Sequence, residues 1–167
     1  MKKKATLIFP IKGYKIKLGI KQRGVGAGLY NGWGGKVEPG QTIRENLAEE
    51  FKTETGGAIC SPNKIRPVAL IHFFFFDNDT DIPDFNVTVY IAEEIIGTIQ
   101  DTDEMKDDKD FAFDGVPYDQ MLPADREFVA KILNGETFFG RVYFNEDKTA
   151  LRKPSYYEPR DPSLLEI

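Results

Sequence analysis

The sequence predicts an α/β or α+β fold, in which helices cover a mixed β-sheet. Residues 14–21 alternate between apolar and polar side chains, a strongly capped helix follows, and further strand-like segments flank a second helix late in the chain. A period of two residues is typical of a half-buried strand, and a period near 3.6 is typical of a helix. Strands on both sides of helices favour a sandwich around a mixed sheet.

Strand-like segments recur along the whole chain. Lys12-Gly13, between the first two of these segments, favours a tight hairpin. The segments predicted to be strands are 5–11, 14–21, 65–76, 86–96, 111–114 and 138–144. Most carboxylates of the acidic run 97–110 are instead predicted to lie in a solvated loop, and the tail after residue 144, rich in proline and charge, is predicted to be irregular.

The first helix is predicted over residues 43–55. Thr42 is a good N-cap, and Glu45 three residues later completes a capping box. Two glycines at 56–57 then end the helix. Its apolar stripe consists of Ile43, Leu47 and Phe51. The second helix opens at residues 123–125, ends at Gly135 and has an apolar side of Phe128, Val129, Ile132 and Leu133.

Two carboxylates of the first helix lie where a purely structural helix does not need them. Glu50 and Glu54 are one turn apart, beside the apolar stripe and next to a glycine-rich loop. They either form the edge of a solvated face, paired with Arg44 or Lys52, or hold a hard cation. The second interpretation is favoured.

The composition limits the classes of function. With 167 residues and 41% hydrophobic content, the chain is predicted to be one domain over 1–167. A net charge of −5 argues against general binding to nucleic acid polymers, although a small anionic ligand is compatible with it. One cysteine and one histidine are too few for a Cys/His zinc site, so a metal here is expected to be oxygen-bound Mg²⁺ or Mn²⁺.

No membrane segment is expected. The apolar run after the first lysines is broken by Pro10 and Lys12, and no small-residue cleavage site follows it. No apolar stretch reaches the length needed to span a bilayer. Together with the single Cys60, these features predict a soluble protein of the reducing cytoplasm. The sequence gives no signal for oligomeric state.

The stretch 24–35 contains six glycines in twelve residues. Such a run is either flexible or lets backbone approach a ligand closely, and its three large apolar residues argue against a disordered linker. Asn31 within it is either a turn residue or an amide that reads a purine edge. Lys21 and Arg23 border this loop and can meet phosphate, whereas the lysines at 15 and 17 are expected on a solvated sheet face.

Four phenylalanines, residues 73–76, place two side chains on each face of the predicted strand, so both faces must be covered. Core packing explains most of this, and one face can also form the wall of an aromatic pocket. His72 in the same strand is interpreted as a histidine at the edge of the core, because no Ser or Asp pattern marks a catalytic triad.

The loop and first helix resemble the Nudix box, G-x5-E-x7-R-E-U-x-E-E-x-G-U, where U is a bulky aliphatic residue. With the first glycine at Gly35, the matching positions are Gly35, Glu50, Phe51, Glu54 and Gly56. Four positions depart from the pattern: Gln41 stands for Glu, Glu49 for Arg, Thr53 for Glu and Gly57 for the aliphatic residue.

The wider chain is similar to the oxidised-purine nucleoside triphosphatases, the 8-oxo-dGTP diphosphatase branch of the MutT/Nudix superfamily. The similar segments are 21–37, 103–105, 116–123 and 138–140, in the same order along the chain. The resemblance implies a Nudix fold, an α/β/α sandwich around a mixed sheet. It also implies Mg²⁺-dependent hydrolysis of a purine nucleoside triphosphate to the monophosphate and pyrophosphate.

The resemblance also implies roles for individual residues. Glu50, Glu54 and the carbonyl of Gly35 would ligate Mg²⁺, with Glu104 as a further carboxylate, and Glu50 would polarise the attacking water. The residues implied in substrate binding are Lys21 and Arg23 near the phosphates, Asn31 and Asp125 at the purine base, and Phe73 in the pocket wall.

The departures leave alternatives open. Thr53 removes one metal carboxylate, and Glu49 replaces a positive residue expected to orient the glutamates. Near the base, Leu122 replaces a stacking Trp, Ala124 replaces the first of two acidic residues, and Val25 replaces a Phe. The alternatives are another nucleoside diphosphate-linked substrate, or a Nudix module that binds a nucleotide without catalysis.

Overall fold

The computed structural model describes residues 3–166 and confirms the predicted α/β class. In that range an eight-stranded sheet has the order β10-β9-β5-β6-β1-β2-β3, and β8 also pairs with β2. The sheet strands are β1 (Lys3–Lys12), β2 (Lys15–Lys21), β3 (Tyr30–Asn31), β5 (Ile65–Phe74), β6 (Phe85–Ala92), β8 (Met105–Ala112), β9 (Phe138–Tyr143) and β10 (Tyr156–Pro159). β4 (Ile59–Cys60) and β7 (Ile95–Ile96) form a separate small sheet.

The sheet is mixed, as predicted. β1 runs parallel to β6 and β5 runs parallel to β9, whereas β5–β6 and β1–β2 are antiparallel. The predicted hairpin between the first two strands forms, with Ile11 opposite Ile16 and Gly13 at a φ of 62° in the turn. Glycine adopts this left-handed conformation without steric cost.

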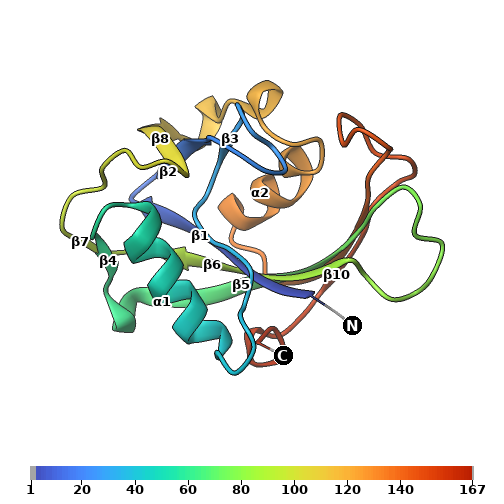
Figure 1. The fold of residues 1–167 in the computed structure, drawn as a ribbon, viewed down its shortest axis with the longest axis horizontal. Helices are drawn as coiled ribbons and strands as arrows, with labels where there is room; N and C mark the ends of the chain where they lie inside the picture. Colours follow the sequence, from blue (N-terminus) through green and yellow to red (C-terminus); the bar gives the residue numbers. More distant parts are fainter. Residues whose placement is uncertain (1–2, 167) are drawn as a thin grey trace.

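The two helices cover opposite faces of the sheet (Figure 1). α1 (Ile43–Glu54) packs Leu47 and Phe51 against a buried cluster that includes Ile8 of β1. α2 (Asp125–Leu133) packs against a larger cluster that includes the next residue, Phe9. Successive side chains of a strand point to opposite faces, so β1 supplies both cores. Each fully buried large apolar side chain contributes roughly 1.5–3 kcal/mol.

The capping of α1 is confirmed. The Thr42 hydroxyl accepts from the Glu45 amide at 3.1 Å, and the Glu45 carboxylate accepts from the Thr42 amide at 3.0 Å. Both bonds satisfy amides that the first turn of a helix leaves unpaired. These bonds fix the residue at which the helix begins, and hence which helical positions its carboxylates occupy.

The prediction that most carboxylates of the acidic run 97–110 lie in a solvated loop is wrong for Asp107, Asp108 and Asp110, which lie in β8. β8 pairs antiparallel with β2, and Lys17 of β2 lies 3.4 Å from Asp108 and 3.3 Å from Asp110. Most side chains of β8 are at least partly exposed, so the strand needs few apolar residues and shows no hydrophobic alternation. Phe111-Ala112 complete β8, and the rest of the predicted 111–114 strand is a 3₁₀ turn.

The tail after residue 144 was wrongly predicted to be irregular throughout. β10 pairs antiparallel with β9, and Tyr157 lies opposite Gly140. A Cβ atom at Gly140 would lie 2.8 Å from the Tyr157 ring, so the glycine makes room for that ring. β10 forms because it pairs with the edge of β9, and this pairing cannot be seen in the local sequence.

Two strand ends differ from the prediction. β5 ends at Phe74, and the Asp84 carboxylate accepts from the Phe75 amide at 2.8 Å as the chain turns. Phe76 is therefore 47% exposed, and the prediction that all four phenylalanines are covered is wrong for this residue. β6 ends at Ala92 instead of residue 96, and β7 continues in the small sheet.

None of the helices among residues 3–166 is both long and apolar enough to cross a membrane.

Candidate active site

The glycine-rich stretch before α1 runs closely along β1. Trp33 and Ile8 exchange backbone hydrogen bonds of 2.7 and 3.1 Å, and the Gly35 carbonyl accepts from the Thr6 amide at 2.9 Å. A Cβ atom at Gly34 would overlap the Thr6 carbonyl. Gly34 therefore permits close contact with β1, where the sequence had suggested close contact with a ligand.

Glu54, the last residue of α1, points into this loop. Its Oε1 accepts a hydrogen bond from the Gly34 amide at 3.0 Å, and the residue is only 8% exposed. Burial, with the charges of Glu50 and Glu104, raises the pKa of Glu54 to about 7, although the Gly34 hydrogen bond and Lys21 act in the opposite direction. A carboxylate with this pKa changes charge near neutral pH.

Glu50 lies against Gly35 one helical turn earlier. A Cβ atom at Gly35 would be 2.7 Å from Oε2 of Glu50, so the glycine allows this carboxylate to reach the loop backbone. Burial raises the pKa of Glu50, and the charges of Glu49, Glu104 and Glu38 raise it further. Glu50 and Glu54 thus flank the Gly34-Gly35 backbone.

Glu104 reaches the same region from the loop before β8. The Thr102 hydroxyl donates to the Glu54 carbonyl at 3.0 Å and accepts from the Glu104 amide at 3.3 Å, which ties this loop to the end of α1. The Glu104 carboxylate also forms an ion pair with Arg23, whose Nε lies 2.7 Å away. The tertiary fold therefore adds a third carboxylate to Glu50 and Glu54.

Lys21, at the end of β2, belongs to the same electrostatic cluster. Burial lowers its pKa, and the charges of Glu54 and Glu104 partly offset that decrease. The structure thus brings together the carboxylates and cations that the sequence singled out, Glu50, Glu54, Glu104, Lys21 and Arg23. We call these five residues the carboxylate cluster.

The donor chemistry of this cluster suits a hard divalent cation. Carboxylate and carbonyl oxygens are the ligands Mg²⁺ prefers, and the Gly35 carbonyl has a second lone pair beyond the one used by Thr6. Across residues 3–166, no three His, Cys, Asp or Glu side chains already form a metal-binding group. Burial is the main cause of the raised pKa values of Glu50 and Glu54, and the neighbouring carboxylates raise them further, so a bound cation would favour the charged form of both groups.

Arg44 does not neutralise these carboxylates. Its Nε and Nη2 bind the carboxylate of Glu166 at 2.6 and 3.0 Å, and Tyr90 donates to the same carboxylate at 2.7 Å. Lys52, the other cation considered from the sequence, forms no ion pair among the described residues 3–166. The interpretation of Glu50 and Glu54 as a paired solvated face therefore has no support in the contacts.

Asn46 is a residue of α1 that the sequence interpretation missed. It is fully buried, and its Oδ1 accepts from the Thr6 hydroxyl at 2.6 Å. Its Nδ2 donates to the Lys36 carbonyl at 2.7 Å and to Oε1 of Gln41 at 3.2 Å. Asn46 thus ties the loop to both β1 and α1. The available signal was an asparagine, a poor helix former, near the apolar side of the helix.

Two of the departures from the Nudix box contact each other. Gln41 donates from Nε2 to the Glu49 carboxylate at 2.8 Å, and its Oε1 accepts from the Glu38 amide at 3.1 Å. Gln41 and Glu49 stand where the pattern has a Glu and an Arg, so this chain has a neutral donor and an acidic acceptor in place of two opposite charges. The hydrogen bond directs the Glu49 carboxylate toward Gln41.

Phe73 and Asp125, two of the residues predicted at the base, belong to the α2 side of the sheet. Phe73 packs on the cluster of that face, stacked on Phe144 with ring centroids 5.6 Å apart. Tyr30 and Ala124, the neighbours of Asn31 and Asp125, are buried in the same cluster. Three distant segments therefore meet around one apolar region. The Asn31 side chain accepts from the Gly32 amide at 2.8 Å, which is the turn role considered from the sequence.

Asp125 is the most unusual residue of this region. It is 3% exposed, and its Oδ2 has no hydrogen-bond partner. Burial raises the pKa of Asp125 to about 8, although a backbone hydrogen bond at Leu122 lowers it. The raised pKa favours the protonated carboxyl group, which can act as both donor and acceptor. A buried polar atom without a partner needs an explanation, and a ligand group would supply one.

The loop at 24–28 lies beside this region. A Cβ atom at Gly26 would lie 3.4 Å from Leu122, so the residue that replaces a stacking Trp packs on the loop. Val25 is 40% exposed. An aliphatic side chain at position 122 contacts a ligand less extensively than an indole ring would.

Comparison with known proteins places this architecture in a family. The model of the NUDIX domain matches residues 5–134. The chain is 30% identical over 146 residues to the oxidized purine nucleoside triphosphate hydrolase of Mus musculus, covering 87% of this chain and 89% of that protein. It is 32% identical over 139 residues to the protein of the same name from Danio rerio, covering 83% and 85%.

A solved structure agrees on the fold. A mutator MutT protein from Bacillus halodurans superposes with a TM-score of 0.74 at 18% identity, covering 95% of this chain and 99% of that one. At this identity the similarity concerns the fold alone. The match of the domain model over most of the chain, with the two relatives, shows that this protein belongs to the Nudix family of hydrolases.

Proposed function

We propose that this chain, as a single domain over residues 1–167, is a Mg²⁺-dependent Nudix hydrolase that cleaves purine nucleoside triphosphates, oxidised ones included, to the monophosphate and pyrophosphate. The observation that carries this proposal is the carboxylate cluster beside Gly34-Gly35, where Glu54 has a pKa of about 7. The names of the mouse and zebrafish relatives support the substrate class.

Four groups would hold the metal ion: the Gly35 carbonyl and the carboxylates of Glu50, Glu54 and Glu104. Nudix hydrolases generally use a divalent metal ion, typically Mg²⁺, and Mn²⁺ suits the same oxygen ligands. When bound, such an ion neutralises polyphosphate charge and lowers the pKa of the attacking water. The Thr6 and Asn46 contacts hold the Gly35-Lys36 backbone in place for this role.

The side chains of the cluster accept the proton of the attacking water and bind the phosphates. Glu50 accepts a proton from the attacking water as the water oxygen bonds to phosphorus. The bond between that phosphorus and the pyrophosphate leaving group then breaks. Lys21 and Arg23 hold the phosphates. To do so, Arg23 breaks its ion pair with the partly exposed Glu104. Their positive charge offsets the negative charge that the leaving group gains.

Recognition of the base is assigned to the α2 side. The protonated Asp125 presents a donor and an acceptor to the purine edge, and Asn31 offers its amide. Phe73 supplies an aromatic wall. Because Leu122 and Ala124 replace a Trp and an acidic residue of the family pattern, we propose weaker discrimination of 8-oxoguanine than the pattern gives.

A specific observation favours a second candidate, a Nudix module that binds nucleotides without turnover. Thr53 is exposed and offers no carboxylate where the pattern has one. The cluster is therefore short of one ligand for an additional ion. Among the enzymatic alternatives, another nucleoside diphosphate-linked substrate keeps the same cluster and changes only the base side.

The test is a product assay with Mg²⁺. The substrates are dGTP, 8-oxo-dGTP, 2-oxo-dATP, diadenosine polyphosphates and ADP-ribose, and the products are resolved by chromatography. We expect release of pyrophosphate and a nucleoside monophosphate, abolished by EDTA. Tight nucleotide binding with no turnover of any compound would establish the binding module instead.

We propose that the protein acts in the reducing cytoplasm, which suits the free thiol of Cys60.

A further inference from the structure

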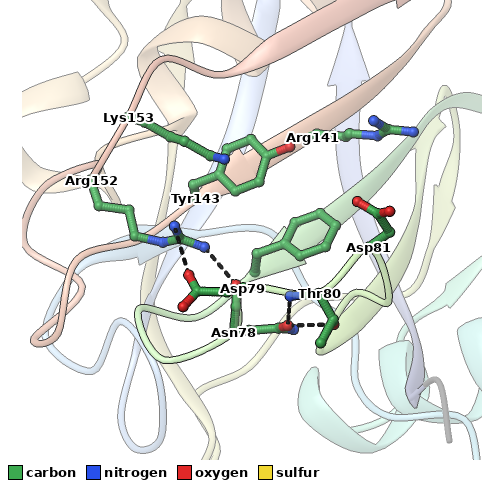
Figure 2. Close-up of a pocket in the computed structure, with 9 residues that line it drawn as sticks. Asn78, Asp79, Thr80, Asp81, Arg141, Tyr143, Arg152 and Lys153 are labelled. Atoms are coloured by element: carbon green, nitrogen blue, oxygen red, sulfur yellow. Dashed lines mark hydrogen bonds and ion pairs between the residues drawn. The ribbon is translucent and has the colours of Figure 1, made fainter.

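A polar pocket lies at the C-terminal end of β5 and is lined by none of the residues of the carboxylate cluster. It is formed by the 77–84 loop, by Phe74, and by Arg141, Tyr143, Arg152 and Lys153 of the β9 strand and the loop after it. We call it the rear pocket. Figure 2 shows the basic side chains and Tyr143 on one side, and Asn78, Asp79 and Asp81 on the other.

The rear pocket is separated from the proposed base site by the sheet itself. Phe74 pairs with Tyr143 in the parallel β5–β9 register, and Phe73 pairs with Val142. Neighbouring strand residues point to opposite faces. Phe73 and Val142 pack with the α2 cluster, so Phe74 and Tyr143 face the other way, with ring centroids 4.9 Å apart. A ligand here would be distinct from the nucleotide proposed above.

The two walls of the rear pocket are held in place before any ligand binds. Nη2 of Arg152 donates to the Asn78 carbonyl at 2.8 Å, which joins the two loops. The Asn78 side chain accepts from the Thr80 amide at 3.0 Å and donates to Asp84 at 2.9 Å. Figure 2 shows the Thr80 contacts and the contacts of Arg152 with the 77–84 loop. A pocket with prearranged walls has a lower ordering cost on binding.

The positive charges of the rear pocket are poorly neutralised. Within residues 3–166, neither Arg141 nor Lys153 forms an ion pair, and the contact of Arg152 with Asp79 is 4.0 Å long. Lys153 and Arg152 lie over the Tyr143 ring, 4.1 and 5.3 Å from its centroid. Nε of Arg152 is buried and has no hydrogen-bond partner. Three cations at one place are notable in a chain whose net charge is −5.

The size and side chains of the rear pocket suit a small anionic group. Its volume is about 120 Å³. This space is large enough for a group of a few heavy atoms. The planar guanidinium group of arginine can donate two parallel hydrogen bonds to two oxygens of a phosphate, and lysine adds a point charge. Asp79 is 93% exposed at the rim and can turn away.

We propose that the rear pocket binds a phosphoryl group, held by Arg141, Arg152 and Lys153 without a metal ion. Inorganic phosphate and the phosphate end of a nucleotide share this chemistry. This proposal does not depend on catalysis at the carboxylate cluster.

The experiment is a titration of ¹⁵N-labelled protein, in EDTA, with inorganic phosphate in one arm and a nucleoside monophosphate in the other. We expect saturable shifts of the backbone amides of Thr80, Tyr143 and Arg152 in the phosphate arm. Similar or tighter binding of the monophosphate at these amides would identify a nucleotide as the source. Absence of binding at these amides in both arms, or shifts confined to residues 21–54, would overturn the proposal.

A double variant, Arg141→Ala with Lys153→Ala, tests the same point without touching the Arg152 contact to Asn78. We expect at least a tenfold loss of phosphate affinity. The matched control is Lys64→Ala with Arg66→Ala, which removes the same two residue types at the opposite end of β5 and should change affinity less than twofold. Circular dichroism checks that both variants fold. Equal loss in both doubles would show nonspecific attraction and sink the proposal.

Discussion

Glu54 and Asp125 are both buried carboxyl groups with raised pKa values, yet their surroundings differ. Glu54 lies among Glu50, Glu104 and Lys21 and accepts a backbone hydrogen bond. Asp125 lies in an apolar region, and one of its oxygens has no partner. Burial is the largest cause of the raised pKa in both residues. The difference between them therefore lies in the neighbouring residues, which decide what each carboxyl group can bind. Clustered carboxylates suit a cation, whereas an isolated one remains protonated and suits hydrogen bonding to a neutral ligand.

The largest expected effect is on catalysis at Glu54. Glu54→Gln keeps the size and the hydrogen bond from the Gly34 amide but removes a metal ligand, so we expect kcat with Mg²⁺ to fall about 10³-fold. Initial rates with saturating nucleotide measure this. Glu146→Gln, at an exposed site outside the cluster, should leave kcat unchanged. Full activity of the Glu54 variant would mean that this carboxylate is only structural.

Asp125→Asn should act on KM. The amide can donate and accept, but its donor and acceptor positions are fixed, so the fit to the purine edge worsens. We expect KM to rise about 10- to 100-fold with kcat within about threefold. A fall in kcat at constant KM would contradict the division between the two carboxyl groups. Wild-type KM should also rise above pH 8, where Asp125 loses its proton, and this rise should be absent in the variant.

Stability without metal gives a comparison independent of activity. The folded pKa of Glu54 is about 7 and its ordinary value is 4.5, so the folded state binds more protons between these values and stability falls as pH rises through this window. Glu54→Gln should therefore raise the free energy of unfolding at pH 8 by about 2–3 kcal/mol, and by almost nothing at pH 4.5. Urea titrations in EDTA measure both values.

Added Mg²⁺ completes this experiment. It should stabilise the wild type at pH 8 and leave Glu54→Gln nearly unaffected, because ligand binding to the folded state alone adds to stability. Equal stabilisation of both proteins by Mg²⁺ would place the metal elsewhere.

Asn46→Ala tests how the loop beside the cluster is held. The substitution leaves the Lys36 carbonyl and the Thr6 hydroxyl without their buried partner, so we expect a loss of about 2–3 kcal/mol in the free energy of unfolding. Mg²⁺ affinity, measured by calorimetry on the folded variant, should fall more than in Gln41→Ala, whose contacts are more exposed. Unchanged Mg²⁺ affinity would limit Asn46 to a structural role.

The smallest expected effect is a gain. Thr53→Glu restores the carboxylate of the family pattern at an exposed position of α1, and a few-fold increase in Mg²⁺ affinity or kcat is expected. Lys52→Glu adds a carboxylate at the neighbouring exposed position and serves as the control. Equal gains in both variants would indicate a general charge effect.

The sequence by itself determined what depends on local pattern. The capping box of α1, the hairpin of β1 and β2, the apolar side of α2 and the pairing of Glu50 with Glu54 on one helical edge follow from spacing within a few residues. The resemblance to the Nudix box correctly predicted the family and the fold. These features share one physical cause, since backbone capping and side-chain periodicity act between near neighbours.

Tertiary structure decided the rest. β8 and β10 carry little apolar signal and exist because an edge of another strand offers hydrogen bonds. The local sequence shows Asn46 only as a polar residue of a helix, because its buried hydrogen bonds are made to Thr6 of β1 and to the Lys36 carbonyl of the loop. The proximity of Glu104 to Glu54, and the isolation of Asp125, likewise depend on segments far apart in the chain. Burial and long-range charge set the pKa of a carboxyl group, and neither can be obtained from its sequence neighbours.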